Sequence, residues 1–328
     1  MTSKKPANTG GLAGIVAGES DISTVGLGTG LNYRGFSIQD LSKNCIFEEV
    51  VHLLIFKSLP NEKQLKEIQE RIASKRELPE PLKRILEQLP AEANAMDVMR
   101  TVSSAMGILE PEGKENDQVN ITLRLIAMFG PALLYWYHFV GSGLKIKTVT
   151  KSSDTVATNF LKLYHLTQDV DPLMVKTLDI SLILYAEHDF NASTFAARCT
   201  VSTMSDFYSG ITSAIGTLRG PLHGGANEAA MKLLEPIKSV EESNKVLETM
   251  WKNKQLVMGF GHRIYKKEDP RSDIIKGCSI ELSQKAYGKP MLVEVSKNIE
   301  SRMINEKKIY PNLDFYAASA YHQCGIRT

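Results

Sequence analysis

The chain has 328 residues, 43% hydrophobic and 23% charged, a composition typical of a globular protein with an ample core. Its formal net charge of +2 gives no electrostatic reason to expect nucleic acid or an anionic membrane as a partner. The N-terminus lacks the apolar stretch of a secretory signal, and no apolar run reaches the roughly 18 residues of a membrane span. We therefore expect a cytoplasmic location.

Cysteine and motif usage excludes several classes of enzyme. The four cysteines are far apart and form no CxxC pair, so free thiols are expected rather than disulfides or zinc ligands. A zinc hydrolase would need closely spaced histidine or cysteine ligands, and a serine hydrolase would need Gly-x-Ser-x-Gly; neither pattern is present. The sequence predicts no metal site.

The first 35 residues are rich in Gly, Ser and Thr and predict an irregular arm with one small hairpin. Within this arm, Gly26–Gly30 has the spacing of a nucleotide-binding loop. However, no buried strand precedes it and no helix opens directly from it, so a nucleotide-binding module is only a minor alternative.

From Ile38 onward, apolar residues recur at helical spacing, with prolines as punctuation. Since alternating β-branched runs are not found, the predicted fold class is all-α. A flexible junction near Gly220–Gly225 predicts a large helical domain over 1–222 and a small one over 223–324, with the active site between them. The expected helices cover 98–109 (capped by Asp97), 121–140, 155–164, 172–186, 205–218, 226–234, 239–253, 272–287 and 292–306.

Two histidines lie in glycine-rich segments, and both are predicted to be functional. His223 is followed by Gly224 and Gly225, and His262 follows Gly259 and Gly261. Glycine removes side-chain bulk, so another molecule can approach the imidazole, and it supplies no side-chain partner for a buried ring nitrogen. With a carboxylate and the trailing Asp-Pro-Arg at 269–271, these histidines suit proton transfer on a carbonyl compound held by its carboxylate.

Four further residues are candidates with competing interpretations. Asp314 stands among apolar neighbours that would raise its pKa toward that of a base, although on sequence alone a helix N-cap is favoured. His188 lies between two acidic residues that would favour its charged form, able to hold a dicarboxylate or to form a surface ion pair. Arg271 suits a carboxylate ligand, but equally a helix cap or a pair with Asp273. Lys266 belongs either to a solvated face or to a phosphate clamp.

The remaining histidines occupy apolar helical contexts. His52, His138 and His165 are interpreted as packing residues, and no role is assigned to His322.

Taken with their neighbours, these motifs resemble the citrate synthase family from about Gly10 to Gly325. The two His-Gly segments are highly specific for that family. The resemblance also rests on Tyr33-Arg34-Gly35, residues 47–55, Tyr185-Ala186-Glu187-His188 through Thr194, and Pro311-Asn312-Leu313-Asp314. Residues 96–101 and 134–138 are similar to the 2-methylcitrate branch of the family.

The resemblance implies an all-helical homodimer whose two domains close over oxaloacetate and an acyl-CoA, with no metal or redox cofactor because the thioester is a substrate. It assigns Asp314 as the base that removes the α-proton, His223 as the donor to the thioester oxygen, and His262 as the acid at the oxaloacetate carbonyl. His188 and Arg271 match oxaloacetate-binding residues, and Lys266 matches a basic contact to CoA.

The branch resemblance implies propionyl-CoA as the acyl substrate, giving 2-methylcitrate and CoA with consumption of water. Citrate synthase proper, which uses acetyl-CoA, remains open, because one methylene group is worth only about 1–3 kcal/mol in an apolar pocket.

The family pattern continues for several dozen residues beyond Thr328 and normally includes arginines that bind substrate. Residues 325–328 are therefore expected to begin a truncated return to the large domain. A homologue with impaired activity, or one with only a structural or regulatory role, is a further alternative.

Overall fold

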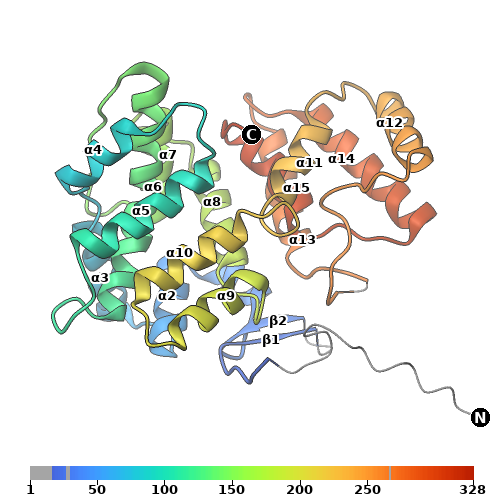
Figure 1. Ribbon diagram of the computed structural model, residues 1–328. Coiled ribbons are helices and arrows are strands. Elements are labelled where there is room, and N and C mark those ends of the chain that lie inside the picture. Colours follow the sequence, from blue (N-terminus) through green and yellow to red (C-terminus); the bar gives the residue numbers. More distant parts are fainter. Residues whose placement is uncertain (1–16, 27–29, 266) are drawn as a thin grey trace, which may run out of the picture.

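The computed structural model describes residues 17–26, 30–265 and 267–328, and helices dominate these residues (Figure 1). The expected all-α class is confirmed. The helices are α1 (Ile38–Asn44), α2 (Phe47–Phe56), α3 (Glu62–Ser74), α4 (Glu80–Gln88), α5 (Ala95–Leu109), α6 (Gln118–Ser142), α7 (Val156–His165), α8 (Pro172–Tyr185), α9 (Ala192–Val201), α10 (Phe207–Leu218), α11 (Ala226–Leu234), α12 (Val240–Lys252), α13 (Ser272–Ser283), α14 (Pro290–Arg302), the π-helix η1 (Met303–Lys307) and α15 (Leu313–Gln323).

The N-terminal arm forms a small antiparallel sheet in the order β1 (Ser23–Val25), β2 (Leu31–Tyr33) and β3 (Phe36–Ser37). The Gly26 amide donates to the Gly30 carbonyl at 3.1 Å and so closes the β1–β2 hairpin. The proposed nucleotide loop is thus a connection between antiparallel strands rather than a strand-to-helix turn, and its residues 27–29 lie outside the described part of the chain.

One group of helices surrounds α6. A buried apolar cluster joins α6 to α4, α5 and α10, which explains why the longest helix is also strongly apolar. By length and composition α6 could span a membrane, but 61% of its most apolar window is buried inside the fold. Core packing therefore accounts for its composition.

The second group, α11–α15, lies beside the first and is joined to it by the loop after α10 (Figure 1). Its core is centred on α15, which packs against α11 and α13. The same apolar cluster continues into β2, α1 and α8, so α8 contacts both groups. The division into domains at 222/223 stays a proposal.

Several helix boundaries differ from the predicted ones. Asp97 is not the cap of α5: the helix begins at Ala95, and the Asn94 side chain accepts from the Met96 amide at 2.9 Å. The short helix α9 was not predicted, because its sequence lacks a buried apolar stripe. Helix α13 ends at Ser283 rather than at Tyr287, ahead of the Gly288–Pro290 punctuation.

Candidate active site

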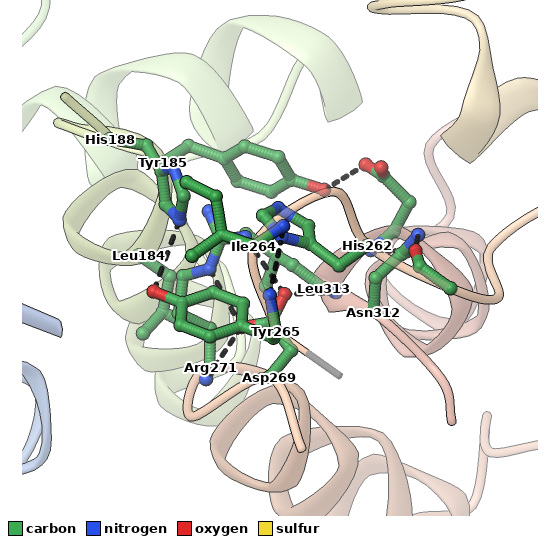
Figure 2. A network of polar contacts seen from close by, with 12 residues as sticks. Leu184, Tyr185, His188, His262, Ile264, Tyr265, Asp269, Arg271, Asn312 and Leu313 are labelled. Carbon is green, nitrogen blue, oxygen red and sulfur yellow. Dashed lines mark hydrogen bonds and ion pairs between the residues drawn. The ribbon is translucent and has the colours of Figure 1, made fainter. Parts of the chain in front are cut away.

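His188 lies in the turn that follows α8, and its ring faces Tyr265 and His262 (Figure 2). Its Nε2 is 3.1 Å from the Tyr265 hydroxyl, and its ring centroid is 5.1 Å from that of His262. Burial, followed by the charges of Arg271 and His262, lowers the pKa of His188 to about 4. The expectation of a charged ring is therefore wrong: the surroundings of His188 favour the neutral imidazole.

The acidic neighbours of His188 are engaged elsewhere. Glu187 Oε1 accepts from the Ser23 hydroxyl at 3.0 Å and from the Asp189 amide at 2.5 Å. The carboxylate of Glu187 therefore stabilises the turn around His188 rather than a positive charge on the imidazole.

His262 is carried by a loop whose backbone requires glycine. Gly259 and Gly261 have φ angles of +83° and +78°, and a Cβ at Gly259 would approach Phe315 to within 2.8 Å. The loop is tied to the segment before α15 by the Asn312 amide, which donates to the Gly259 carbonyl at 2.9 Å. His262 Nδ1 accepts from the backbone amides of Ile264 and Tyr265 at 3.1 and 3.3 Å.

Arg271 is buried and paired within its own loop (Figure 2). Its Nε and Nη2 donate to the two carboxylate oxygens of Asp269 at 2.9 and 2.8 Å, and Asp269 also accepts from the Leu313 amide. The partner is therefore Asp269 rather than Asp273. Asp269 takes the Nε–Nη2 edge of the guanidinium, and no other described residue bonds to the remaining edge, whose geometry suits a second carboxylate.

Asp314 lies in the first turn of α15, but it is not the cap. The Asn312 side chain caps the helix by accepting from the Asp314 amide at 3.0 Å. The Asp314 carboxylate instead accepts from the Tyr185 hydroxyl at 2.6 Å. Burial raises the pKa of Asp314, as its apolar neighbours predicted.

His223 lies in the loop between α10 and α11 and contacts the start of α9. Its Nε2 accepts from the Ser193 amide at 3.2 Å and lies 2.9 Å from the Ser193 hydroxyl. A Cβ at Gly224 would approach the Leu218 carbonyl oxygen to within 2.3 Å, so this position requires glycine. Burial lowers the pKa of His223, which favours the neutral imidazole.

The structure brings His188, His262 and Arg271 into one polar network (Figure 2). Asp314 is hydrogen-bonded to Tyr185, the last residue of α8, and the nearby Arg271 and His223 act to lower its pKa against the effect of burial. Lys266 lies outside the described residues. Its neighbour Lys267 lines a hollow beside His262, together with Lys308.

Sequence reasoning assigned no role to Tyr185, Tyr265 or Ser193, although Tyr185 and Ser193 lie in the stretch through Thr194 that carries the family resemblance. Tyr265 follows His262 by three residues, but spacing alone does not show that a short loop brings its hydroxyl to His188. Ser193 is also hidden, because its contact with His223 depends on the unpredicted helix α9.

The three packing histidines each bind a backbone carbonyl. The partners are Ser58 for His52, Leu163 for His138 and Cys324 for His165, at 2.7, 2.9 and 2.9 Å respectively. His52 and His138 are buried, and such contacts satisfy a buried ring nitrogen, in agreement with the packing interpretation. His165 is exposed, so its contact instead attaches the end of α7 to the Cys324 carbonyl.

Comparison with known proteins defines the class of protein that carries this site. Residues 11–328 match the family described as citrate synthase, C-terminal domain. The chain belongs to the citrate synthase family, and the resemblance is confirmed. The family relationship also supports the expected enzyme class, one that condenses an acyl-CoA with oxaloacetate.

Within that family the chain is similar to enzymes of both branches. It is 46% identical to 2-methylcitrate synthase of Shewanella oneidensis, over 100% of this chain and 87% of the relative. It is 39% identical to citrate synthase 2 of Bacillus subtilis, over 97% and 85% of the two chains. A citrate synthase of Thermoplasma acidophilum, solved as a ternary complex with carboxymethyl coenzyme A and oxaloacetate, superimposes with a TM-score of 0.87 at 30% identity, covering 96% of this chain and 84% of that one.

Proposed function

We propose that the protein condenses propionyl-CoA with oxaloacetate and water to give 2-methylcitrate and CoA. The observation that carries the chemistry is that two histidines each accept backbone amide hydrogen bonds on one ring nitrogen, in the same site as a carboxylate of raised pKa. The 46% identity to a 2-methylcitrate synthase supports the choice of acyl substrate.

Asp314 is the proposed base. The α-proton of a thioester is only weakly acidic, so its removal near neutral pH requires a carboxylate whose pKa lies above its ordinary value. Burial provides that change, while the Tyr185 hydroxyl holds the carboxylate in place at 2.6 Å. Asp314 removes the proton, and the electron pair moves toward the thioester oxygen.

His223 is the proposed donor to that oxygen. Its Nε2 accepts from the Ser193 amide, so the proton of the neutral ring resides on Nδ1. A preorganised N–H donor at a developing oxyanion is among the larger contributions to catalysis. The lowered pKa keeps the ring neutral and so preserves this tautomer.

His262 is the proposed acid for the second substrate. Two backbone amides donate to its Nδ1, so the proton of the neutral ring resides on Nε2 and can pass to the ketone oxygen of oxaloacetate as the carbon–carbon bond forms. The α-proton held by Asp314 then replaces it, which restores the neutral ring and the free carboxylate. The second edge of Arg271 and the ring of His188 would bind the carboxylates of oxaloacetate. Water then adds to the thioester carbonyl, the C–S bond breaks, and a proton of the water passes to the departing CoA sulfur, which leaves the free acid.

The proposed CoA site adjoins His262. Lys267 and Lys308 line the hollow there and would attract the phosphates of the nucleotide. A role for Lys266 remains part of the proposal. The proposal includes no metal or redox cofactor, because the thioester itself supplies the activated acyl group.

Comparison of initial rates with propionyl-CoA and acetyl-CoA at fixed oxaloacetate tests the proposed substrate. CoA release would be followed with a thiol reagent and the acid product identified by its mass. We expect kcat/KM to favour propionyl-CoA by about 10- to 200-fold, the discrimination that one methylene group provides. A preference for acetyl-CoA would instead assign citrate synthase activity.

A homodimer is also proposed, and α9 supports it. None of the ten residues of α9 is buried, although Phe195 and Val201 are among them, and the adjacent Met204 is 94% exposed. A second copy of the chain covering this helix would bury that apolar surface. Light scattering coupled to gel filtration should give twice the chain mass.

The proposal retains two domains with the boundary at 222/223 and a cytoplasmic location. The four cysteines are all free thiols, which agrees with a reducing compartment.

A further inference from the structure

We propose that one rung of the N-terminal sheet, Ser23 paired with Tyr33, positions His188 to bind oxaloacetate. This inference rests on the proposed function, because it assumes that His188 contacts oxaloacetate. The two residues are direct partners in the β1–β2 register. Directly opposite residues of an antiparallel pair project their side chains from the same face, so one rung can reach one target with both.

Tyr33 holds the backbone on both sides of the turn that follows α8. Its hydroxyl donates to the Ile183 carbonyl at 3.0 Å and accepts from the Glu187 amide at 3.3 Å. The side chain is fully buried in the apolar cluster shared by the two helical groups. Burial raises the pKa of Tyr33, so the hydroxyl retains the proton that it donates.

Ser23 holds the same turn through a side chain. Its hydroxyl donates to Glu187 Oε1 at 3.0 Å, and this oxygen also accepts from the Asp189 amide at 2.5 Å. Asp189 has a φ angle of +54°, in the left-handed region that non-glycine residues rarely occupy. The rung therefore fixes the residues immediately before and after His188.

Ser23 and Tyr33 make their side-chain hydrogen bonds to α8 and the turn that follows it. Among the described residues, neither is hydrogen-bonded to Asp314, the proposed base, or to His262, the proposed acid. Loss of the rung should therefore weaken oxaloacetate binding more than it slows the chemical step. This pattern differs from general destabilisation, which would reduce the amount of active enzyme without changing KM.

Tyr33→Phe removes the hydroxyl and keeps the packed ring. We expect KM for oxaloacetate to rise about tenfold, equivalent to ~1.4 kcal/mol, with KM for the acyl-CoA and kcat each changed less than threefold. The matched control is Tyr208→Phe, at a buried tyrosine of α10 that belongs to the other apolar cluster. The control should leave KM for oxaloacetate unchanged.

Two variants of Glu187 separate geometry from charge. Glu187→Gln keeps an oxygen that can accept from Ser23 and Asp189, so it should retain KM for oxaloacetate, whereas Glu187→Ala should raise it as Tyr33→Phe does. Equal KM values for Tyr33→Phe, Glu187→Ala and the wild type would overturn the inference.

His188→Ala distinguishes failure of the inference from failure of the proposed function. If oxaloacetate binding by calorimetry is unchanged in His188→Ala, the proposed role of His188 is wrong and the inference falls with it. If His188→Ala weakens binding while Tyr33→Phe does not, only the positioning role is wrong.

Discussion

The surroundings shift the pKa values of two carboxylates near the candidate site in opposite directions. Burial acts to raise the pKa of Asp269, yet hydrogen bonds and charge from Arg271 hold it below its ordinary value. Asp314 is also affected by burial, but its main hydrogen bond comes from the neutral Tyr185, and its pKa is raised. The environments thus suit Asp269 to anchoring a cation and Asp314 to accepting a proton.

Asp314→Asn should abolish condensation while oxaloacetate still binds. The amide keeps the shape of the side chain and an oxygen for the Tyr185 hydroxyl, but it cannot take up the α-proton. We expect kcat to fall by at least 10²- to 10⁴-fold, the usual contribution of a positioned base. Steady-state rates and calorimetric titration of oxaloacetate measure the two effects separately, and near-normal turnover would remove Asp314 from the mechanism.

The same substitution should stabilise the protein at neutral pH. The folded-state pKa of Asp314 lies above its ordinary value of 3.8, so its favourable contribution is fully present below the unfolded pKa and is lost as pH rises through the folded pKa. Asn does not titrate. The Tm of Asp314→Asn should therefore increasingly exceed that of the wild type as pH rises above about 4. A Tm difference that shrinks with rising pH would contradict this assignment.

At the level of elements, the sequence favoured Asp314 as the N-cap of the last helix, whereas the structure has Asn312 in that role and starts α15 at Leu313. Both Asn312 and Asp314 are good N-cap residues, and the backbone path decides between them. The loop that carries His262 pairs with this segment through the Asn312 amide and the Gly259 carbonyl, residues 53 positions apart in the chain. Such long-range contacts cannot be predicted from the spacing of apolar residues along the chain.

Asn312→Ala should reduce both stability and turnover. It removes the α15 cap, which typically costs about 0.5–2 kcal/mol, and it releases the backbone amide of Asp314, the proposed base. The control is Asp117→Ala. Asp117 caps α6, far along the chain from the site residues, and its side chain accepts from the Asn120 amide at 2.8 Å. This control should lose comparable stability in denaturant titration yet keep kcat; equal losses of kcat in both variants would refute a special role for the α15 cap.

The contact between Asp179 of α8 and the start of α2 should make the stability of the folded protein depend on pH near neutrality. Both oxygens of Asp179 accept from the Phe47 amide, at 3.3 and 3.2 Å, and burial with the nearby Glu48 raises the pKa of Asp179 to about 7. Its contribution to stability is therefore present below its unfolded pKa and is lost as pH rises through about 7. Asp179→Asn keeps an acceptor for Phe47, so its Tm should fall less than that of the wild type between pH 5 and pH 8.

At the scale of the whole molecule, sequence could predict an all-helical chain and name the histidines, but not how they meet. His188 follows α8 of one helical group, His262 and Arg271 belong to the other, and His223 lies in the loop between them. Their meeting depends on α8, which packs against both groups, and on the turn held by the N-terminal sheet. Neither contact has a local sequence signature.

Oxaloacetate should draw the two helical groups together. A ligand shifts a conformational equilibrium only if it binds one state more tightly, and a dicarboxylate that bridges His188 and Arg271 would favour the arrangement in which both contacts are made. We expect the radius of gyration from small-angle scattering to decrease when oxaloacetate is added. Arg271→Leu, which removes one anchor of the bridge, should show no decrease. An unchanged wild-type profile, with binding proven by calorimetry, would mean that the site is already assembled before the substrate arrives.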